Sequence, residues 1–343
     1  MEGHFVDSLV EVGPNGRERY YDSRGYGRPR GDGVVLSPVE AAHLLYRGDL
    51  TTVDNLDFNS FLCEHDDIIV PFTVYRDLRA RGFYISPARD GWVADPSGID
   101  FVVHPRGTGP WDGEVAYRIK VVGEWTTVRP AELDDLVLAV VDEESEVTYL
   151  AVNTPSLSGS NEPLDSNSFT GRLIDDRVVC PNPPSDVFTE SFYGQWMGDG
   201  EHLLQLSLLE AIYLVEIGHL ELKDGIDAVE QRGSDLEGNR FAFRRAVYRV
   251  LRDKGLVPKT GFKFGADFRT YSGVQSVEAL EHSEHLVRVL PTGRSLSPQE
   301  IALDVRMAHG VRKRLVFAIV ESDDIPDAAE PSIYWRTIER VTP

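Results

Sequence analysis

The chain is poor in the features that mark several common protein classes. Its 343 residues include only two cysteines, Cys63 and Cys180, too few for a disulfide framework or a cysteine-rich zinc site. No apolar run approaches the length of a membrane span, and the N-terminal segment lacks the pattern of a signal peptide. We therefore expect a cytoplasmic protein that makes no contact with a membrane.

Lysine is also scarce, since it supplies six of the 35 basic residues, while the formal net charge is −21. An acidic chain with little lysine is typical of a proteome that works in concentrated salt, where repulsion between surface charges is screened. An ordinary acidic protein is the alternative. The net charge excludes a general attraction to nucleic acid, so any RNA-binding surface must be local.

Motifs for phosphate binding and for common hydrolytic chemistry are missing. The sequence contains no P-loop, HExxH, EF-hand or GxSxG pattern. Acidic pairs such as Asp66–Asp67 and Asp323–Asp324 are present, but in a chain this acidic they are typical of solvated loops. We expect no metal site and no cofactor.

The sequence repeats itself. Five segments of the first half have counterparts in the second half, in the same order, at offsets that drift only from 167 to 179. Internal similarity that keeps its order indicates a duplicated unit. The pairs are LSPVEAAHLLYRGDL (36–50) with LSLLEAIYLVEIGHL (206–220), YRDLRARGF (75–83) with YRVLRDKGL (248–256), DFVVHP (100–105) with DFRTYS (267–272), AYRIKVV (116–122) with EHLVRVL (284–290), and LVLAVVDEE (136–144) with LVFAIVESD (315–323).

Each copy alternates helical and extended patterns, which predicts an α/β (α+β) fold of two tandem repeats. In each repeat we expect a small N-terminal α+β subdomain, followed by a mixed-sheet α/β nuclease-like module. The second copy carries an extra helix where the first has only RPAELDD. The predicted bounds are 1–155 for a degenerate repeat (1–73 and 74–155), 156–171 for a polar linker, and 172–343 for an active repeat (172–245 and 246–343).

Three residues of the second copy are candidates for catalysis. Tyr271 ends the strand-like FRTY, His282 directly precedes Ser283, and Lys313 lies in GVRKRLVFAIV. Residues 240–340 resemble the catalytic module of the tRNA-intron (splicing) endonuclease family, which carries a Tyr, a His opening an H-S-x-hydrophobic strand, and a Lys in an AHGVRK-type segment. The SPxEAxxLL-like helix in each half extends the resemblance. The layout is similar to the family's two-repeat form, in which two chains form a dimer of four modules.

The resemblance implies metal-independent cleavage of RNA by its own 2′-hydroxyl, leaving a 2′,3′-cyclic phosphate and a 5′-hydroxyl. It makes Tyr271 the general base, His282 the general acid and Lys313 the cation that stabilises the transition state. From the residues alone the base is open between Tyr271 and His282, because histidine titrates near neutrality and tyrosine is a poor base without a nearby cation. Taken singly, each of the three also fits a structural or surface role, and His285 lies close enough to compete with His282.

The first copy keeps none of the three residue types, and we expect it to be catalytically inactive and architectural. It also lacks the basic inserted helix. The alignment places His104 opposite Tyr271, Glu114 opposite His282, and Asp134 opposite Lys313.

Local positive charge marks the expected RNA-binding face. Residues 286–316 hold six basic and two acidic residues in an otherwise acidic chain. The resemblance implies that Arg306 and an arginine of the C-terminal strand stack around a flipped base. Arg336 is the candidate for the second arginine, with Arg340 as the alternative. An ion pair with Asp304 or Glu300 is the structural alternative for Arg306.

The resemblance also implies the partners: pre-tRNA with a bulge-helix-bulge junction, and a second copy of the chain in a homodimer. The acidic loops 142–146 and 321–330 are candidates to dock into a basic pocket of the neighbour, or are solvated decoration. Two other functions stay open, a non-catalytic RNA-binding or scaffold subunit and a metal-dependent DNA nuclease on a related module. The first requires loss of the three residues in both copies, and the second requires sensitivity to a chelator.

Overall fold

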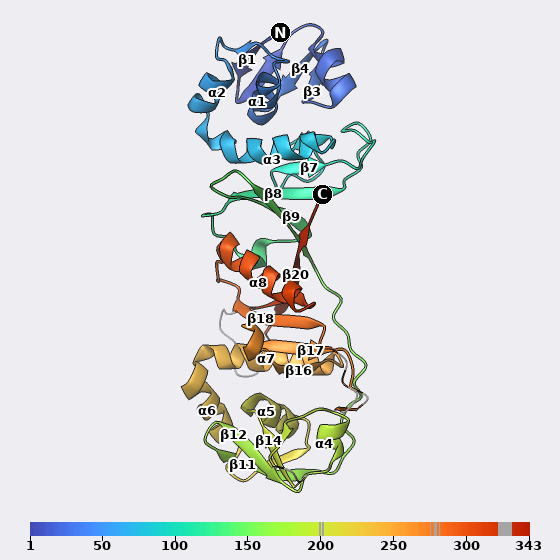
Figure 1. The fold of residues 1–343 in the computed structure, drawn as a ribbon, viewed down its shortest axis with the longest axis vertical. Coiled ribbons are helices and arrows are strands. Elements are labelled where there is room, and N and C mark those ends of the chain that lie inside the picture. Colours follow the sequence, from blue (N-terminus) through green and yellow to red (C-terminus); the bar gives the residue numbers. More distant parts are fainter. Residues whose placement is uncertain (199, 201, 275, 278–279, 281, 322–330) are drawn as a thin grey trace.

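The computed structural model describes residues 1–198, 200, 202–274, 276–277, 280, 282–321 and 331–343. The molecule is elongated, with an N-terminal subdomain of each repeat at either end and a shared sheet between them (Figure 1). Two tandem repeats with mixed sheets confirm the predicted α+β class. Among the described residues, no helix is long and apolar enough to cross a membrane.

The first repeat begins with a five-stranded sheet of order β3-β4-β2-β1-β5 and continues into the shared sheet. Its strands are β1 (Glu2–Val6), β2 (Leu9–Val12), β3 (Arg28–Arg30), β4 (Gly33–Leu36), β5 (Thr52–Val53), β6 (Ile85–Pro87), β7 (Phe101–Val103), β8 (Tyr117–Gly123), β9 (Leu136–Val141) and β10 (Val147–Asn153). Its helices are η1 (Arg17–Asp22), α1 (Pro38–Tyr46), α2 (Phe58–Glu64), η2 (Asp66–Ile68), α3 (Ile69–Ala80) and η3 (Pro130–Glu132).

The second repeat has the same order of elements, with the sheet β13-β14-β12-β11-β15 at its start. Its strands are β11 (Phe169–Ile174), β12 (Arg177–Pro181), β13 (Gln195–Trp196), β14 (Leu203–Leu206), β15 (Leu220–Leu222), β16 (Val257–Thr260), β17 (Phe268–Tyr271), β18 (His285–Pro291), β19 (Arg314–Val320) and β20 (Ile333–Val341). Its helices are α4 (Asp186–Thr189), α5 (Leu208–Glu216), α6 (Ile226–Glu237), α7 (Asn239–Asp253), η4 (Phe262–Phe264) and α8 (Pro298–Gly310). Helix α8 is the predicted insertion, since η3 occupies its place in the first repeat.

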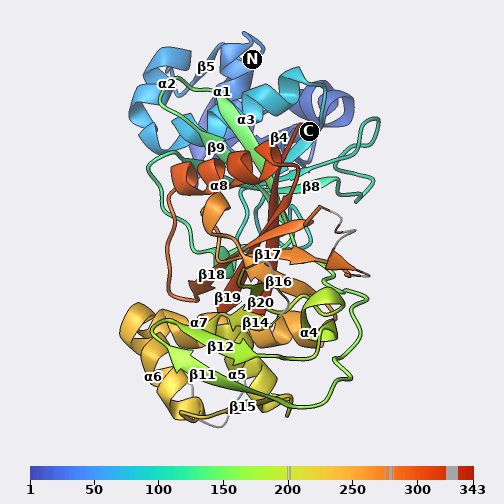
Figure 2. The ribbon, with the colours of Figure 1, turned by 60° about the horizontal axis from the view of Figure 1, so that its bottom comes forward.

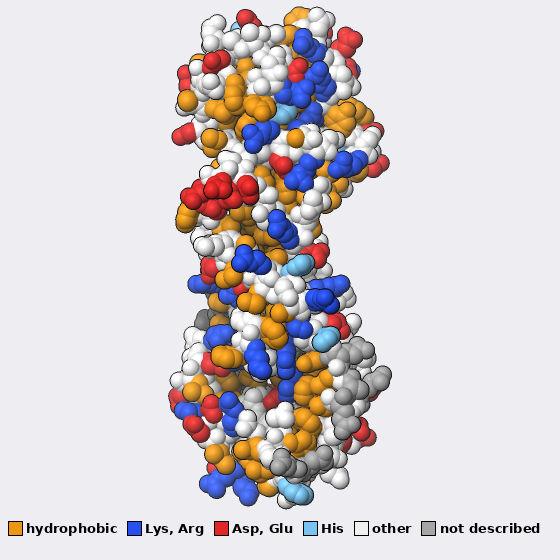
Figure 3. Space-filling model, in the orientation of Figure 1, with side chains coloured by type: hydrophobic (Ala, Val, Ile, Leu, Met, Phe, Trp, Pro, Cys, Tyr) orange, Lys and Arg blue, Asp and Glu red, His pale blue; other side chains and the backbone are white. Residues whose placement is uncertain are grey.

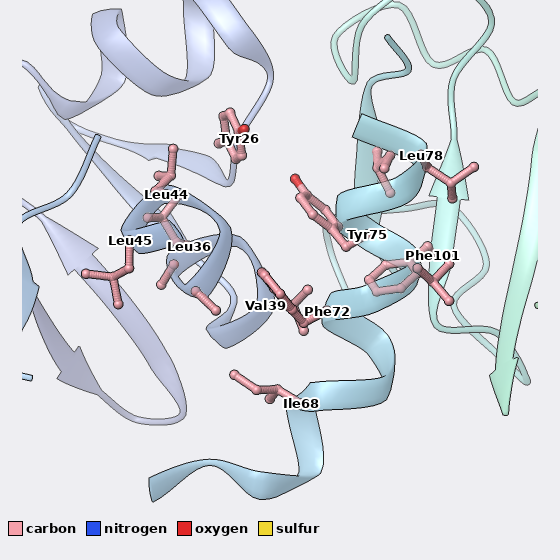
Figure 4. Close-up of a cluster of buried hydrophobic side chains, with 14 of the residues drawn as sticks. Tyr26, Leu36, Val39, Leu44, Leu45, Ile68, Phe72, Tyr75, Leu78 and Phe101 are labelled. Carbon is pink, nitrogen blue, oxygen red and sulfur yellow. The ribbon is translucent and has the colours of Figure 1, made fainter. Parts of the chain in front are cut away.

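Helices α1 and α5 begin with capping boxes. The side chains of Ser37 and Ser207 accept hydrogen bonds from the backbone N–H groups of Glu40 and Glu210, whose carboxylates accept from the cap residues in return. In Figure 4, Val39 of α1 meets Phe72 of α3, and α3 also packs on the shared sheet. Each repeat thereby joins its N-terminal subdomain to its module through one continuous core.

The two modules share one ten-stranded sheet of order β16-β17-β18-β19-β20-β10-β9-β8-β7-β6. Strands β10 and β20 pair antiparallel at its centre, where Ala151 lies opposite Glu339. A second joint lies nearby, because Val128 and Leu296 exchange two backbone hydrogen bonds of 2.9 and 2.8 Å. The repeats are therefore related by an approximate two-fold axis within one chain.

Strand register confirms the alignment of the two copies. Phe101 pairs with Ile119 in the first repeat, as Phe268 pairs with Val287 in the second. Ile119 pairs with Val137, as Val287 pairs with Val316. These pairs reproduce the offsets of 167, 168 and 179 from the sequence.

The segment between the repeats follows the outside of the second module (Figure 2) and is held there. The N–H of Gly159 donates to the carbonyl of Lys254 at 2.8 Å, and the N–H of Ser160 donates to the carbonyl of Ser272 at 2.5 Å. Leu157 and Leu164 are buried in the core of the second repeat. Although residues 156–168 are mostly polar, two leucines of this segment pack into the core of the second repeat. The segment is therefore held against the second module rather than extended into solvent.

Candidate active site

Three chain segments meet at one end of the second module, next to Tyr271. Strand β17 ends at Tyr271, and the antiparallel β18 begins at His285, so His282 lies at the same end of the sheet. The N–H of Glu284 donates to the carbonyl of Thr270 at 2.9 Å, which closes the two strand ends together. Tyr271 is 8 % exposed, whereas His282 is open to solvent.

Lys313 reaches the same place from another element. Strands β18 and β19 run parallel, so Lys313, directly before β19, lies beside the residues directly before β18. Its Nζ donates to the carbonyl of Ser283 at 2.5 Å, next to His282. Partial burial and the charge of Arg269 both lower the pKa of the Lys313 ammonium.

A fourth side chain at this site was not anticipated from the sequence. The guanidinium of Arg269 lies 5.8 Å from the centre of the Tyr271 ring. Residues two apart on a strand project from the same face, so the alternation in FRTY contains the signal that places Arg269 beside Tyr271. The structure therefore places a second cation, besides Lys313, next to Tyr271.

His285, the competing histidine, is a buried residue of β18. The hydroxyl of Thr270 lies 3.2 Å from its Nδ1, and burial lowers the pKa of its imidazole. His282 is the histidine open to solvent and therefore to a substrate.

The corresponding end of the first repeat is filled by structural contacts. His104 is 4 % exposed, and burial lowers its pKa. Its Nδ1 lies 2.7 Å from the carbonyl oxygen of Glu114, and its Nε2 lies 3.0 Å from the hydroxyl of Ser86. Both ring nitrogens are thus engaged, which leaves neither for a substrate.

The predicted basic face loses two of its six cations to ion pairs. Arg288 pairs with Asp304, and Arg294 pairs with Glu300 at 3.2 Å. Arg306 on α8 is exposed, and no described carboxylate lies within ion-pair distance of it. Arg312 and Arg314, which flank Lys313, are also exposed, and among the described residues no carboxylate lies within ion-pair distance of either of them.

Arg336 has a different environment. Its Nε donates to the carbonyl of Leu133 at 2.6 Å, its Nη1 donates to Thr154 at 3.1 Å, and its Nη2 lies 3.3 Å from Asp134. All three partners belong to the first repeat, and the side chain is 11 % exposed. Arg340, the alternative, is exposed on the same strand. The assignment of Arg336 to RNA stays a prediction.

Acidic side chains form a patch on the surface beside β8 and β9, whereas basic side chains lie over both repeats (Figure 3). No cluster of three or more potential metal ligands occurs among the described residues. Of the two acidic loops, 142–146 is described, whereas residues 322–330 of the other lie outside the described part of the chain.

Comparisons with known proteins match both the repeats and the site. The family described as "tRNA intron endonuclease, N-terminal domain" matches residues 1–62 and 169–232. The family described as "tRNA intron endonuclease, catalytic C-terminal domain" matches residues 241–326, which hold Tyr271, His282 and Lys313. Two N-terminal domains and a catalytic domain define a two-repeat endonuclease.

Relatives match over the whole chain. A tRNA-splicing endonuclease of Natronomonas pharaonis is 59% identical over 343 residues and one of Haloarcula marismortui 52%, with 100% of each chain covered. One of Methanococcoides burtonii is 34% identical, covering 95% of this chain and 97% of its own. The chain belongs to the tRNA intron endonuclease family. The halophilic archaeal sources of the first two relatives agree with the high-salt interpretation of the composition.

Proposed function

We propose that this endonuclease removes introns from pre-tRNA by cutting bulge-helix-bulge junctions without a metal ion. The observation that carries the proposal is the meeting of Tyr271, His282 and Lys313 at one end of the second module. They arrive from β17, from the segment before β18 and from the segment before β19, and Lys313 is bonded to the residue that follows His282.

The chemistry uses the RNA as its own nucleophile. Tyr271 takes the proton of the 2′-hydroxyl, and the resulting oxygen attacks the adjacent phosphorus. The bond to the 5′-oxygen breaks, and His282 gives that oxygen a proton. Lys313 offsets the charge that develops on the phosphoryl oxygens. The products are a 2′,3′-cyclic phosphate and a 5′-hydroxyl.

RNA is held by exposed arginines for which the described residues supply no carboxylate partner. Arg312 and Arg314 adjoin Lys313 in sequence and Arg306 lies on the preceding helix α8, and guanidinium groups suit both phosphate pairing and base stacking. A local basic patch of this kind allows RNA binding by a protein with a net charge of −21. In concentrated salt only arginines in close contact with phosphate groups contribute, because salt screens attraction over longer distances.

A homodimer places two such sites on one substrate. The first repeat contains a hollow of about 820 Å³ between its N-terminal subdomain and its module. Either acidic loop of a second copy, 142–146 or 321–330, is a candidate to dock into this hollow, and Ser145 and Glu146 line the hollow within their own chain. The hollow is lined by five arginines, namely Arg24, Arg47, Arg76, Arg79 and Arg81.

The test is cleavage of a defined bulge-helix-bulge RNA in concentrated salt with EDTA, followed by analysis of the ends. Cleavage with a cyclic phosphate at both junctions is expected. Loss of activity in EDTA would indicate a metal-dependent nuclease, and binding without cleavage would indicate a scaffold subunit. Size measurement under the same conditions tests the dimer, because a stable monomer that cuts both junctions contradicts it.

A further inference from the structure

Phe192 adopts a backbone conformation that is costly for its residue type. Its φ angle is 52°, in the left-handed region, where the other described non-glycine residues are Asp, Asn, Ser and one Arg. For an L-residue that region costs roughly 1–2 kcal/mol, and strain of this kind concentrates at functional sites. The surrounding structure must therefore hold Phe192 in place.

The first repeat builds the same turn without that cost. The position of Phe192 is taken there by Gly25, whose φ is 67°. Two residues later, Gly27 and Gly194 correspond, and each donates its N–H to the buried carboxylate of its own repeat, Glu40 at 2.7 Å and Glu210 at 3.0 Å. The two repeats share this backbone conformation, but only the second repeat has a phenylalanine at this position.

The two repeats fill the space around this position in opposite ways. In the first repeat a Cβ on Gly25 would lie 2.7 Å from the ring of Tyr84, which occupies the space. In the second repeat Val257 stands at the position of Tyr84, and the Phe192 ring enters instead. Phe192, Val257 and Tyr271 form a small buried cluster of their own. The rings of Phe192 and Tyr271 meet edge to face, with centres 5.8 Å apart.

A lysine found only in the active repeat holds the strained turn. Nζ of Lys259 donates to the carbonyl of Phe192 at 3.1 Å and to that of Gly194 at 3.2 Å, and it pairs with Glu210 at 2.6 Å. The first repeat has Ser86 at this position. Lys259 lies on β16, which pairs with β17, so the catalytic module itself holds the turn of the N-terminal subdomain.

We propose that Phe192 is a positioning residue for Tyr271, and that the N-terminal subdomain takes part in catalysis through it. The inference rests on the proposed role of Tyr271 as the base. The Phe192 ring packs against one side of the Tyr271 ring and so restricts the orientations that the Tyr271 ring can adopt. A displacement of about 1 Å at a reacting group lowers a rate by roughly a hundredfold. A contact that fixes the Tyr271 ring can therefore raise the rate by more than its strain costs in stability.

The experiment compares Phe192→Gly, which copies the first repeat and relieves the strain, with Phe192→Leu, which keeps an apolar side chain. Cleavage of a bulge-helix-bulge RNA is measured in high salt, with kcat and KM determined separately and thermal unfolding recorded. Phe192→Gly is expected to lower kcat by about 10- to 100-fold with KM almost unchanged, and Phe192→Leu to restore part of the loss. Phe61→Ala, a buried phenylalanine of the first subdomain, is the control for destabilisation alone. It should leave kcat near that of the wild type.

Tyr271→Phe separates this inference from the proposed function. If Tyr271→Phe is severely impaired, adding Phe192→Gly should cause no further loss, because Phe192 acts through the hydroxyl that is already gone. A wild-type kcat in Phe192→Gly, or an equal further loss in the double variant, would overturn the positioning role alone. Full activity in Tyr271→Phe would overturn the base assignment itself.

Discussion

The Nη2 atom of Arg336 lies 3.3 Å from the Oδ1 atom of Asp134, and these residues belong to different repeats. Asp134 occupies in the first repeat the position that Lys313 occupies in the second, as the register of the shared sheet shows. The first copy thus has an anion where the second copy has Lys313, its proposed catalytic cation. That anion binds a side chain of the second copy's last strand.

Removing Arg336 tests which role this side chain has. Arg336→Met should lower the free energy of unfolding by about 1–3 kcal/mol, because the carbonyl of Leu133 loses a charged donor. Asp134→Asn, which leaves that bond in place, should cost less. Denaturant unfolding measures both. An unchanged stability with a raised KM for RNA would instead assign Arg336 to the substrate.

The two aligned copies allow a paired test of the acid. His282→Ala should reduce kcat by about 10²- to 10⁴-fold, the usual contribution of a general acid. His104→Ala should leave kcat near the wild-type value, measured well below its own melting temperature. A comparable loss in both variants would contradict an inactive first copy.

The RNA-binding surface predicts a change in salt dependence. Arg306→Gln should weaken binding and reduce the slope of log K against log salt by about one unit, since one phosphate contact is lost. Arg294→Gln is the matched control, because Glu300 already offsets the charge of Arg294. Filter binding over a range of salt concentrations measures both, and equal slopes for Arg306→Gln and the wild type would exclude the contact.

The buried glutamates at the two capping boxes differ in their charge partners. Glu210→Gln should cost about 3–5 kcal/mol, because Lys259 is left buried without its anion. Glu40→Gln should cost less, since no lysine faces Glu40 at the matching position. Unfolding in guanidinium measures the two variants, and an equal cost would show that the capping bonds alone matter.

Acid stability should follow the same pair. Burial would raise the pKa of the Glu210 carboxyl, but Lys259 and the hydrogen bonds around it lower that pKa to about 2 from 4.5. A lowered folded-state pKa stabilises the fold above about 4.5, and this contribution is lost as the pH falls toward 2. Burial raises the pKa of Glu40, so protonation of Glu40 on acidification relieves a penalty. Lys259→Met should therefore flatten the loss of stability between pH 4.5 and 2, as followed by circular dichroism.

The sequence predicted what depends on order and spacing. Because duplication preserves both, the offsets located the inserted helix. The three residues of the proposed site came instead from the resemblance of residues 240–340 to a known family, since the first copy keeps none of them. The sequence did not predict Phe192 or Lys259, since their role depends on a φ angle and on the exchange of side-chain volume with Tyr84 and Val257. Nor did it predict that Arg336 would bond to the first repeat, which requires knowing that β10 pairs with β20.

The antiparallel joint between β10 and β20 has an evolutionary consequence. Two identical single-repeat chains meeting across such an axis must carry the same sequence on both sides, so each change is made twice. In one fused chain the two halves vary independently around the same joint. The second half can thereby keep a strained phenylalanine and a largely buried lysine that the first half replaces with Gly25 and Ser86, although both halves share one backbone path.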